Sequence, residues 1–229
     1  MTPSHTRLLT AALLAVVAVA ACRSGTPGAA RISSQPDPYG QGDAAAIARA
    51  KADSARYPYT EADVHFMSGM IGHHAQAIAM AGWAPTHGAS ESVRTLAERI
   101  INAQRDEITI MQQWLRDRQQ SVPEASPKGV KMVMNGEEHV MLMPGMLTED
   151  QMKQLDQATG KEFDRLFLTF MIQHHQGAVS MVKDLFNTYG AGQDVTVFKL
   201  ASDVNVDQTT EIARMQRMLF ALAIESRSQ

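Results

Sequence analysis

Two segments of this chain are near copies of each other, and their spacing is helical. MIGHHAQAIAM at 70–80 matches MIQHHQGAVSM at 171–181, an offset of 101 residues. Each copy is followed by a second repeated segment, first QRDEI and then QTTEI, at an offset of 104 residues. Residues three, four and seven positions apart share one face of a helix. The duplication therefore predicts two similar helical hairpins, which pack most economically as a four-helix bundle.

Capping signals and chain breakers set the expected boundaries of these elements. The first hairpin is expected to have helices at 60–83 and 90–120, which begin at Thr60 and Ser90. The second is expected to have a short helix from Thr148 to near 160, then long helices at 161–187 and from 194 or 196 to 224. Between the hairpins, Asn135-Gly136 lies within alternating apolar runs and predicts a β-hairpin. The expected fold is all-α: a four-helix bundle with a small Met-rich β-hairpin insertion.

The N-terminus has the three parts of a secretory signal. Arg7 lies in a short basic start, residues 8–21 form an apolar run too short to span a bilayer, and small residues precede a cut site. Val19-Ala20-Ala21-Cys22 resembles the bacterial lipoprotein box, and Cys22 is the only cysteine, so no disulfide can form. We expect a lipoprotein signal peptide at 1–21 and a lipidated Cys22 that anchors the protein to a membrane of the cell envelope, facing the periplasm or the exterior. An ordinary signal peptide with a nearby thiol is the alternative.

Composition divides the rest of the chain. Residues 22–59 are expected to form a flexible tether, rich in Gly, Ser, Pro and Gln, with a short helix at 43–56. The duplicated domain is expected at 60–225, with the first hairpin at 60–120, the insertion at 121–147 and the second hairpin at 148–225. A formal net charge of −3 leaves no basic stripe, which argues against a nucleic-acid partner.

The repeated segments carry imidazole, carboxylate and thioether groups at matching positions. A single histidine on an apolar face is more often a core residue, but two matched pairs are costly to bury without polar partners or a metal. We therefore interpret the four histidines as metal ligands, whereas the matched glutamates could instead be exposed charges or pair with Arg99 and Arg214. The candidates are His73, His74, Met80, Glu107 and Met111 in the first hairpin, and His174, His175, Met181, Glu211 and Met215 in the second, with Met70 and Met171 as secondary candidates.

The ligand types indicate copper. Imidazole binds zinc, copper, iron or nickel, whereas the soft thioether sulfur favours Cu(I), and the chain has 15 methionines against 7 phenylalanines. No Glu-x-x-His segment occurs, as di-iron bundles require, and no His-Glu-x-x-His segment of a zinc protease occurs either. Another first-row metal remains open, and any single methionine at helical spacing also fits a packing role.

The insertion offers a second group of soft ligands. Met132 and Met134 are two residues apart, as are Met141 and Met143, and alternation along a strand would point each pair to one face. Met146 and His139 are nearby in the sequence. We expect a second, more exposed Cu(I) site here.

These motifs resemble a known family, the domain-of-unknown-function family 305. Its hallmark is Met-Ile-x-His-His-x-x-Ala-x-x-Met followed by Gln-x-x-Glu-Ile-x-x-Met, and the resemblance covers about 60–223, including Met-Pro-Gly-Met-Leu-Thr at 143–148. It implies a ferritin-like bundle, often exported, and some members resemble periplasmic copper-binding proteins that contribute to copper tolerance. This chain departs from the pattern at Gly72, where proline is frequent, and at Ala75, where glutamine is frequent.

The resemblance and the residues lead to one expected function. We expect an exported protein that binds copper as Cu(I) for buffering, tolerance or transfer in the cell envelope, and that catalyses no reaction. Its expected partners are a metal ion and a membrane, and a homo-oligomer is open. Two alternatives remain: a ferritin-like oxidase or hydrolase with another metal, and a metal-free scaffold whose histidines form polar networks.

Overall fold

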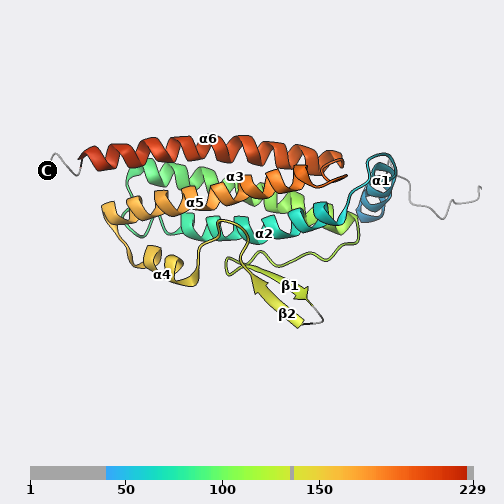
Figure 1. Ribbon diagram of the computed structural model, residues 1–229, viewed down its shortest axis with the longest axis horizontal. Coiled ribbons are helices and arrows are strands. Elements are labelled where there is room, and N and C mark those ends of the chain that lie inside the picture. The colour runs from blue at the N-terminus through green and yellow to red at the C-terminus, as the bar shows by residue number, and fades with distance from the viewer. Residues whose placement is uncertain (1–39, 135–136, 226–229) are drawn as a thin grey trace, which may run out of the picture. The chain divides into compact units, whose positions relative to one another are not determined.

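The structure has helix starts at the capping residues that the sequence predicted, each with its local hydrogen bond. The computed structural model describes residues 40–134 and 137–225, which belong to one unit of the chain, Gln35–Gln229. Thr60 and Thr148 each form a capping box, and the Ser90 side chain accepts a hydrogen bond from the Val93 amide. The helices are α1 (Asp43–Arg56), α2 (Glu61–Gly82), α3 (Glu91–Asp117), α4 (Glu149–Gln157), α5 (Gly160–Asn187) and α6 (Val195–Glu225), and the strands are β1 (Val130–Met134) and β2 (Glu137–Met141) (Figure 1). The expected signal peptide, Cys22 and most of the tether lie outside the described residues.

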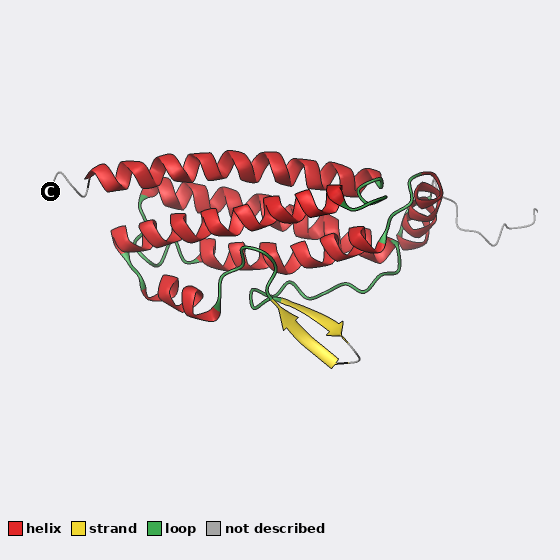
Figure 2. Ribbon diagram, viewed as in Figure 1, coloured by secondary structure: helices red, strands yellow, loops and turns green. Residues whose placement is uncertain are grey.

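The four long helices form the expected bundle. Helices α2, α3, α5 and α6 lie side by side, with α2 against α3, α5 against α6, and α2 against α5 (Figure 2). Helix α1 contacts α3, and α4 contacts α2 and α5. Strands β1 and β2 pair antiparallel, with Val130 opposite Met141, and β1 contacts α2. The predicted fold is confirmed.

The buried methionines show how the two hairpins pack. One apolar cluster includes Met70 of α2 and Met181 of α5, while another includes Met80 of α2 and Met171 of α5. Met70 precedes the His-His pair of its helix and Met181 follows the pair of its own. Helices α2 and α5 therefore run antiparallel, and their His-His pairs meet midway along the contact.

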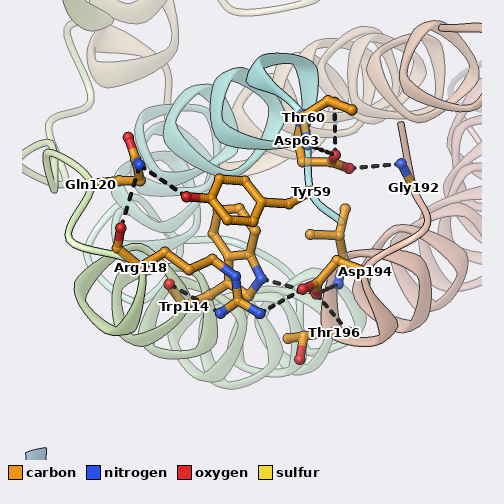
Figure 3. A network of polar contacts seen from close by, with 10 residues as sticks. Tyr59, Thr60, Asp63, Trp114, Arg118, Gln120, Gly192, Asp194 and Thr196 are labelled. Carbon is orange, nitrogen blue, oxygen red and sulfur yellow. Dashed lines mark hydrogen bonds and ion pairs between the residues drawn. The ribbon is translucent and has the colours of Figure 1, made fainter. Parts of the chain in front are cut away.

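Two equivalent aspartates join the hairpins reciprocally. Asp63 of α2 accepts a 2.7 Å hydrogen bond from the amide of Gly192, in the turn between α5 and α6 (Figure 3). Asp164 of α5 accepts bonds of 3.1 and 3.2 Å from the amide of Ser90, in the turn between α2 and α3. Both carboxylates are buried. Each hairpin thus binds the turn of the other through one aspartate. The repeat aligned these two aspartates in the sequence, but it did not indicate which backbone amides they bind.

A third buried carboxylate fixes the start of α6. Asp194 accepts hydrogen bonds from the Trp114 indole at 3.0 Å and from the amides of Thr196 and Val197, and it forms an ion pair with Arg118 (Figure 3). Asp194 therefore caps α6, one of the two starts that the sequence allowed.

The insertion docks where the two copies of the repeat differ. A Cβ on Gly72 would lie 2.7 Å from a methyl of Val130, and one on Gly177 would lie 1.9 Å from the carbonyl oxygen of Pro144. Gln76, which occupies the position of Gly177 in the first copy, accepts a 2.6 Å bond from the Leu147 amide. These departures from the repeat make room for the insertion and hold it against α2 and α5.

Across residues 40–134 and 137–225, no helix is both long and apolar enough to cross a membrane.

Candidate metal centre

Four imidazole rings lie together in the middle of the bundle. His73 and His74 of α2 and His174 and His175 of α5 are fully buried. The ring centroids of His73 and His174 are 3.8 Å apart, whereas the neighbours within each pair are 6.3 Å apart. The closest contact therefore joins the two halves of the repeat, so both halves build a single centre.

The two outer rings are each held by a glutamate of the adjacent helix. His74 Nε2 lies 2.7 Å from Glu107 of α3, and His175 Nε2 lies 2.7 Å from Glu211 of α6. An ionised carboxylate only accepts hydrogen bonds, so each Nε2 carries a proton, and Nδ1 is the ring nitrogen left for a metal ion. Sequence reasoning predicted both glutamates as direct ligands; the structure places them behind the imidazoles, where they fix the tautomer and the ring orientation.

The two inner rings differ from each other. His73 Nε2 donates a 3.0 Å hydrogen bond to the carbonyl oxygen of Pro144 in the insertion, whereas neither nitrogen of His174 has a partner. The Nδ1 atoms of His73, His74 and His175 also lack partners. Among the described residues, ten buried side-chain nitrogen or oxygen atoms have no partner, and five of them belong to these four rings. Leaving one such buried atom without a hydrogen bond costs about 1–3 kcal/mol of folding stability. A ligand bound at this cluster would offset that cost.

Burial keeps the inner rings uncharged. Desolvation, and then the charge of His74, lowers the pKa of His73 from 6.5 to about 3. Desolvation, together with the other three histidines, lowers the pKa of His174 well below its usual value. Both rings are therefore neutral at physiological pH, and each offers a nitrogen lone pair.

The thioethers of the predicted helical ligands are buried on the two sides of this histidine layer. One apolar cluster contains Met70, Met111 and Met181, and the other contains Met80, Met171 and Met215. Each cluster takes residues from both hairpins. No three His, Cys, Asp or Glu side chains in the described part of the chain gather closely enough to hold one ion between them.

The methionines of the insertion whose side chains are described, Met141, Met143 and Met146, do not share one exposed face. Strand β2 ends at Met141, which is 39 % exposed, so the alternation does not extend to Met143. Met143 and Met146 are buried instead, and the Met143 sulfur and the Met181 methyl both lie beside Gly69 of α2. The side chains of Met132, Met134 and His139 lie outside the described residues.

A cavity of about 220 Å³ opens between α3 and α6, beside the two glutamates. It is also lined by Gln104 and Gln208, which the repeat aligns, and by Asp207, which sequence reasoning missed. Asp207 corresponds to Ala103 in the first copy, so comparison of the copies gave it no signal. Burial, and then the charges of Glu107, Asp203 and Glu211, raises the pKa of Asp207.

Comparison with known protein families shows which family this chain belongs to. The model of a domain of unknown function (DUF305) matches residues 63–219, a range that holds both His-His pairs and both glutamates. The chain belongs to the DUF305 family.

Solved structures resemble the bundle as well. A DUF305 protein from Streptomyces coelicolor, described as a candidate secreted protein, is 30 % identical, with a TM-score of 0.59 over 71 % of this chain and 94 % of that one. A DUF305 fragment from Deinococcus radiodurans is 28 % identical, with a TM-score of 0.58 over 71 % of this chain and 98 % of the fragment. CopM in its Cu(II)-bound form is 32 % identical, with a TM-score of 0.54 over 69 % of this chain and 96 % of CopM. No curated protein matched the chain.

The contact at Gly177 predicts how strongly this DUF305 centre depends on the insertion. We expect Gly177→Ala to destabilise the protein by about 1–3 kcal/mol, because the new methyl displaces the Pro144 carbonyl that accepts the His73 proton. Gly82→Ala is the matched control, since its methyl meets nothing within 4 Å, and it should be neutral or stabilising by up to about 1 kcal/mol. Urea unfolding measures both, and equal stabilities of the two variants would contradict the prediction.

The neutral inner rings predict acid sensitivity of the metal-free protein. The unfolded chain protonates each histidine near pH 6.5, but folded His73 does so only near pH 3. The unfolded state thus binds more protons between these values. The free energy of unfolding should therefore decrease as the pH is lowered, by up to ~1.4 kcal/mol per pH unit for each inner ring. Above about pH 7 this dependence should vanish.

Urea unfolding in the presence of a chelator, at pH values from 7.5 to 4.5, measures this slope. His174→Phe should reduce it, because it removes one of the two groups responsible. His65→Gln changes an exposed histidine of α2 and should leave the slope as in the wild type. The explanation fails if His174→Phe retains the full slope.

Proposed function

We propose that this protein binds copper as Cu(I) at the buried histidine centre and buffers it or passes it on, without catalysing a reaction. The observation that carries the proposal is the set of five imidazole nitrogens without partners, in four fully buried rings contributed by both hairpins. A neutral imidazole has one N–H and one lone pair, so each of the four rings can offer one lone pair to a metal ion.

The protonation state of the rings supports metal binding at neutral pH. A metal takes the lone pair of a neutral imidazole, and the lowered pKa values of His73 and His174 mean that no proton has to leave first. The bonds from His74 to Glu107 and from His175 to Glu211 resemble the carboxylate–histidine pairs that orient imidazole ligands. In this proposal the glutamates position the ligands.

The choice of copper depends on the sulfur atoms. Thioethers flank the histidine layer on both sides, and the soft thioether sulfur selects Cu(I) over zinc or iron. Met181 and Met143 are the best placed, because both lie against Gly69, one helical turn before His73.

The similarity to CopM points the same way. Structures of CopM exist with Cu(I), with Cu(II) and with silver, at 28–32 % identity to this chain. Silver(I) and Cu(I) are both soft monovalent ions, which thioether sulfur favours.

Competition for Cu(I) against a selective chelator tests the proposal. We expect the His73→Phe/His174→Phe double variant to bind Cu(I) about 100-fold more weakly than the wild type, because it removes the inner ligands and keeps a ring in each place. His65→Ala removes an exposed histidine of the same helix and should change the affinity less than threefold. Thermal unfolding without metal checks that each variant folds.

The same titration separates the parts of the proposal. Unchanged affinity in the folded double variant would overturn the histidine centre. Unchanged affinity in a Met143→Leu/Met181→Leu variant would remove these two thioethers from the site and leave the imidazoles. Metal analysis of untreated protein that finds iron or manganese in place of copper would overturn the choice of metal.

We also propose that the protein acts in the cell envelope, held by a lipid on Cys22. The sequence at 19–22 supports this location, and so does the candidate secreted relative. Expression of Cys22→Ser in a bacterial host should move the protein from the membrane fraction to the soluble fraction, whereas Ser24→Ala, two residues further on, should leave it membrane-bound. Equal distributions of the Cys22→Ser variant and the wild type would refute the anchor.

A further inference from the structure

The α3–α6 cavity is lined by polar groups that the copper proposal does not use. Gln104 and Gln208 are each only 3 % exposed, and both line the cavity. Both amide atoms of Gln208 and the amide oxygen of Gln104 have no protein partner. Buried amide groups normally form hydrogen bonds. A polar ligand in the cavity would supply the partners that these two side chains lack.

Carboxylates surround the same cavity. Glu107 and Glu211 use one oxygen to accept from a histidine, and their side chains remain 15 % and 24 % exposed. Asp207 adds a third acid, and Arg99 contributes one cation. The carboxylates outnumber the cation, so the field in the cavity is negative. Burial first, and then the neighbouring carboxylates, raises the pKa of Asp207.

The repeat gives the cavity its symmetry. Gln104 and Gln208 occupy equivalent positions, as do Glu107 and Glu211, at the common offset of 104 residues. Equivalent donors from the two hairpins thus face one space between α3 and α6.

We propose that this cavity is an outer site for a hydrated divalent cation, held through its waters by the carboxylates of Asp207, Glu107 and Glu211 and by the amide oxygens of Gln104 and Gln208. The donors are all oxygen atoms, which suit hard ions such as Mn²⁺, Mg²⁺ and Ca²⁺. The cavity is large enough for an ion with its own waters. The ion has to be held through its waters, because no three His, Cys, Asp or Glu side chains of the described residues gather closely enough to bind one ion directly.

This site goes beyond the copper proposal and does not depend on it. It places a cation one glutamate away from His74 and from His175, on the solvent side of each hydrogen bond. An ion that enters between α3 and α6 therefore meets oxygen ligands before it meets the imidazoles.

Titration of the full chain with Mn²⁺, followed by electron paramagnetic resonance of the free ion, tests the proposal. The wild type should bind one Mn²⁺ saturably, because Mn²⁺ prefers oxygen donors to thioethers. Asp207→Asn should weaken binding at least tenfold. Gln104→Leu/Gln208→Leu should do the same without unfolding the bundle, because leucine fills the space of two buried, unpartnered amides.

Asp203→Asn is the matched control. It removes the same charge one helical turn from Asp207, at a residue that pairs with Lys199 and does not line the cavity, and binding should change less than threefold. Three outcomes would overturn the proposal: no saturable Mn²⁺ binding by the wild type, wild-type binding by Asp207→Asn, or equal weakening by Asp203→Asn. The Cu(I) affinity of Asp207→Asn should stay within threefold of the wild type, so failure of this site and failure of the copper centre are distinguishable.

Discussion

The two inner imidazole rings in the middle of the helical bundle, those of His73 and His174, must remain uncharged, and much of the structure depends on that constraint. A protonated ring there would be a buried charge without a counterion, which is far costlier than a neutral polar group. The antiparallel contact of α2 with α5 brings His73 and His174 to 3.8 Å, and the carboxylates on the outer rings lie at the solvent side. The reciprocal bonds of Asp63 and Asp164 join the two hairpins at both ends of this contact.

The insertion makes the two inner histidines of an otherwise nearly symmetric centre different from each other. It reaches one side of the α2–α5 contact, where Gly177 leaves room for the Pro144 carbonyl and Gln76 holds the Leu147 amide. Pro144 then fixes the proton of His73, while His174 has no partner on either nitrogen. Departures from the repeat, which sequence comparison alone would treat as divergence, are therefore the contacts that dock the insertion.

The donor atoms change in hardness across the bundle. Carboxylate and amide oxygens line the cavity between α3 and α6, imidazole nitrogens lie at the centre, and thioether sulfurs fill the apolar clusters beyond. This order joins the two proposals, because an oxygen-lined surface suits a hydrated divalent ion whereas nitrogen and sulfur in an apolar interior suit Cu(I). The glutamates belong to both regions, with one side towards the cavity and one oxygen on a histidine.

The sequence by itself determined the helices, their caps and the two candidate histidine pairs, because capping and periodicity are local properties of the chain. It also indicated the family, through motifs that lie within single helices. Only the tertiary structure decided that His73 meets His174, that Glu107 lies behind His74, and that Met143 is buried. Periodicity states which residues share a face of one helix, but the direction and register of α2 against α5 decide which faces meet. Asp207 shows the same limit, because its neighbours in the cavity come from another helix.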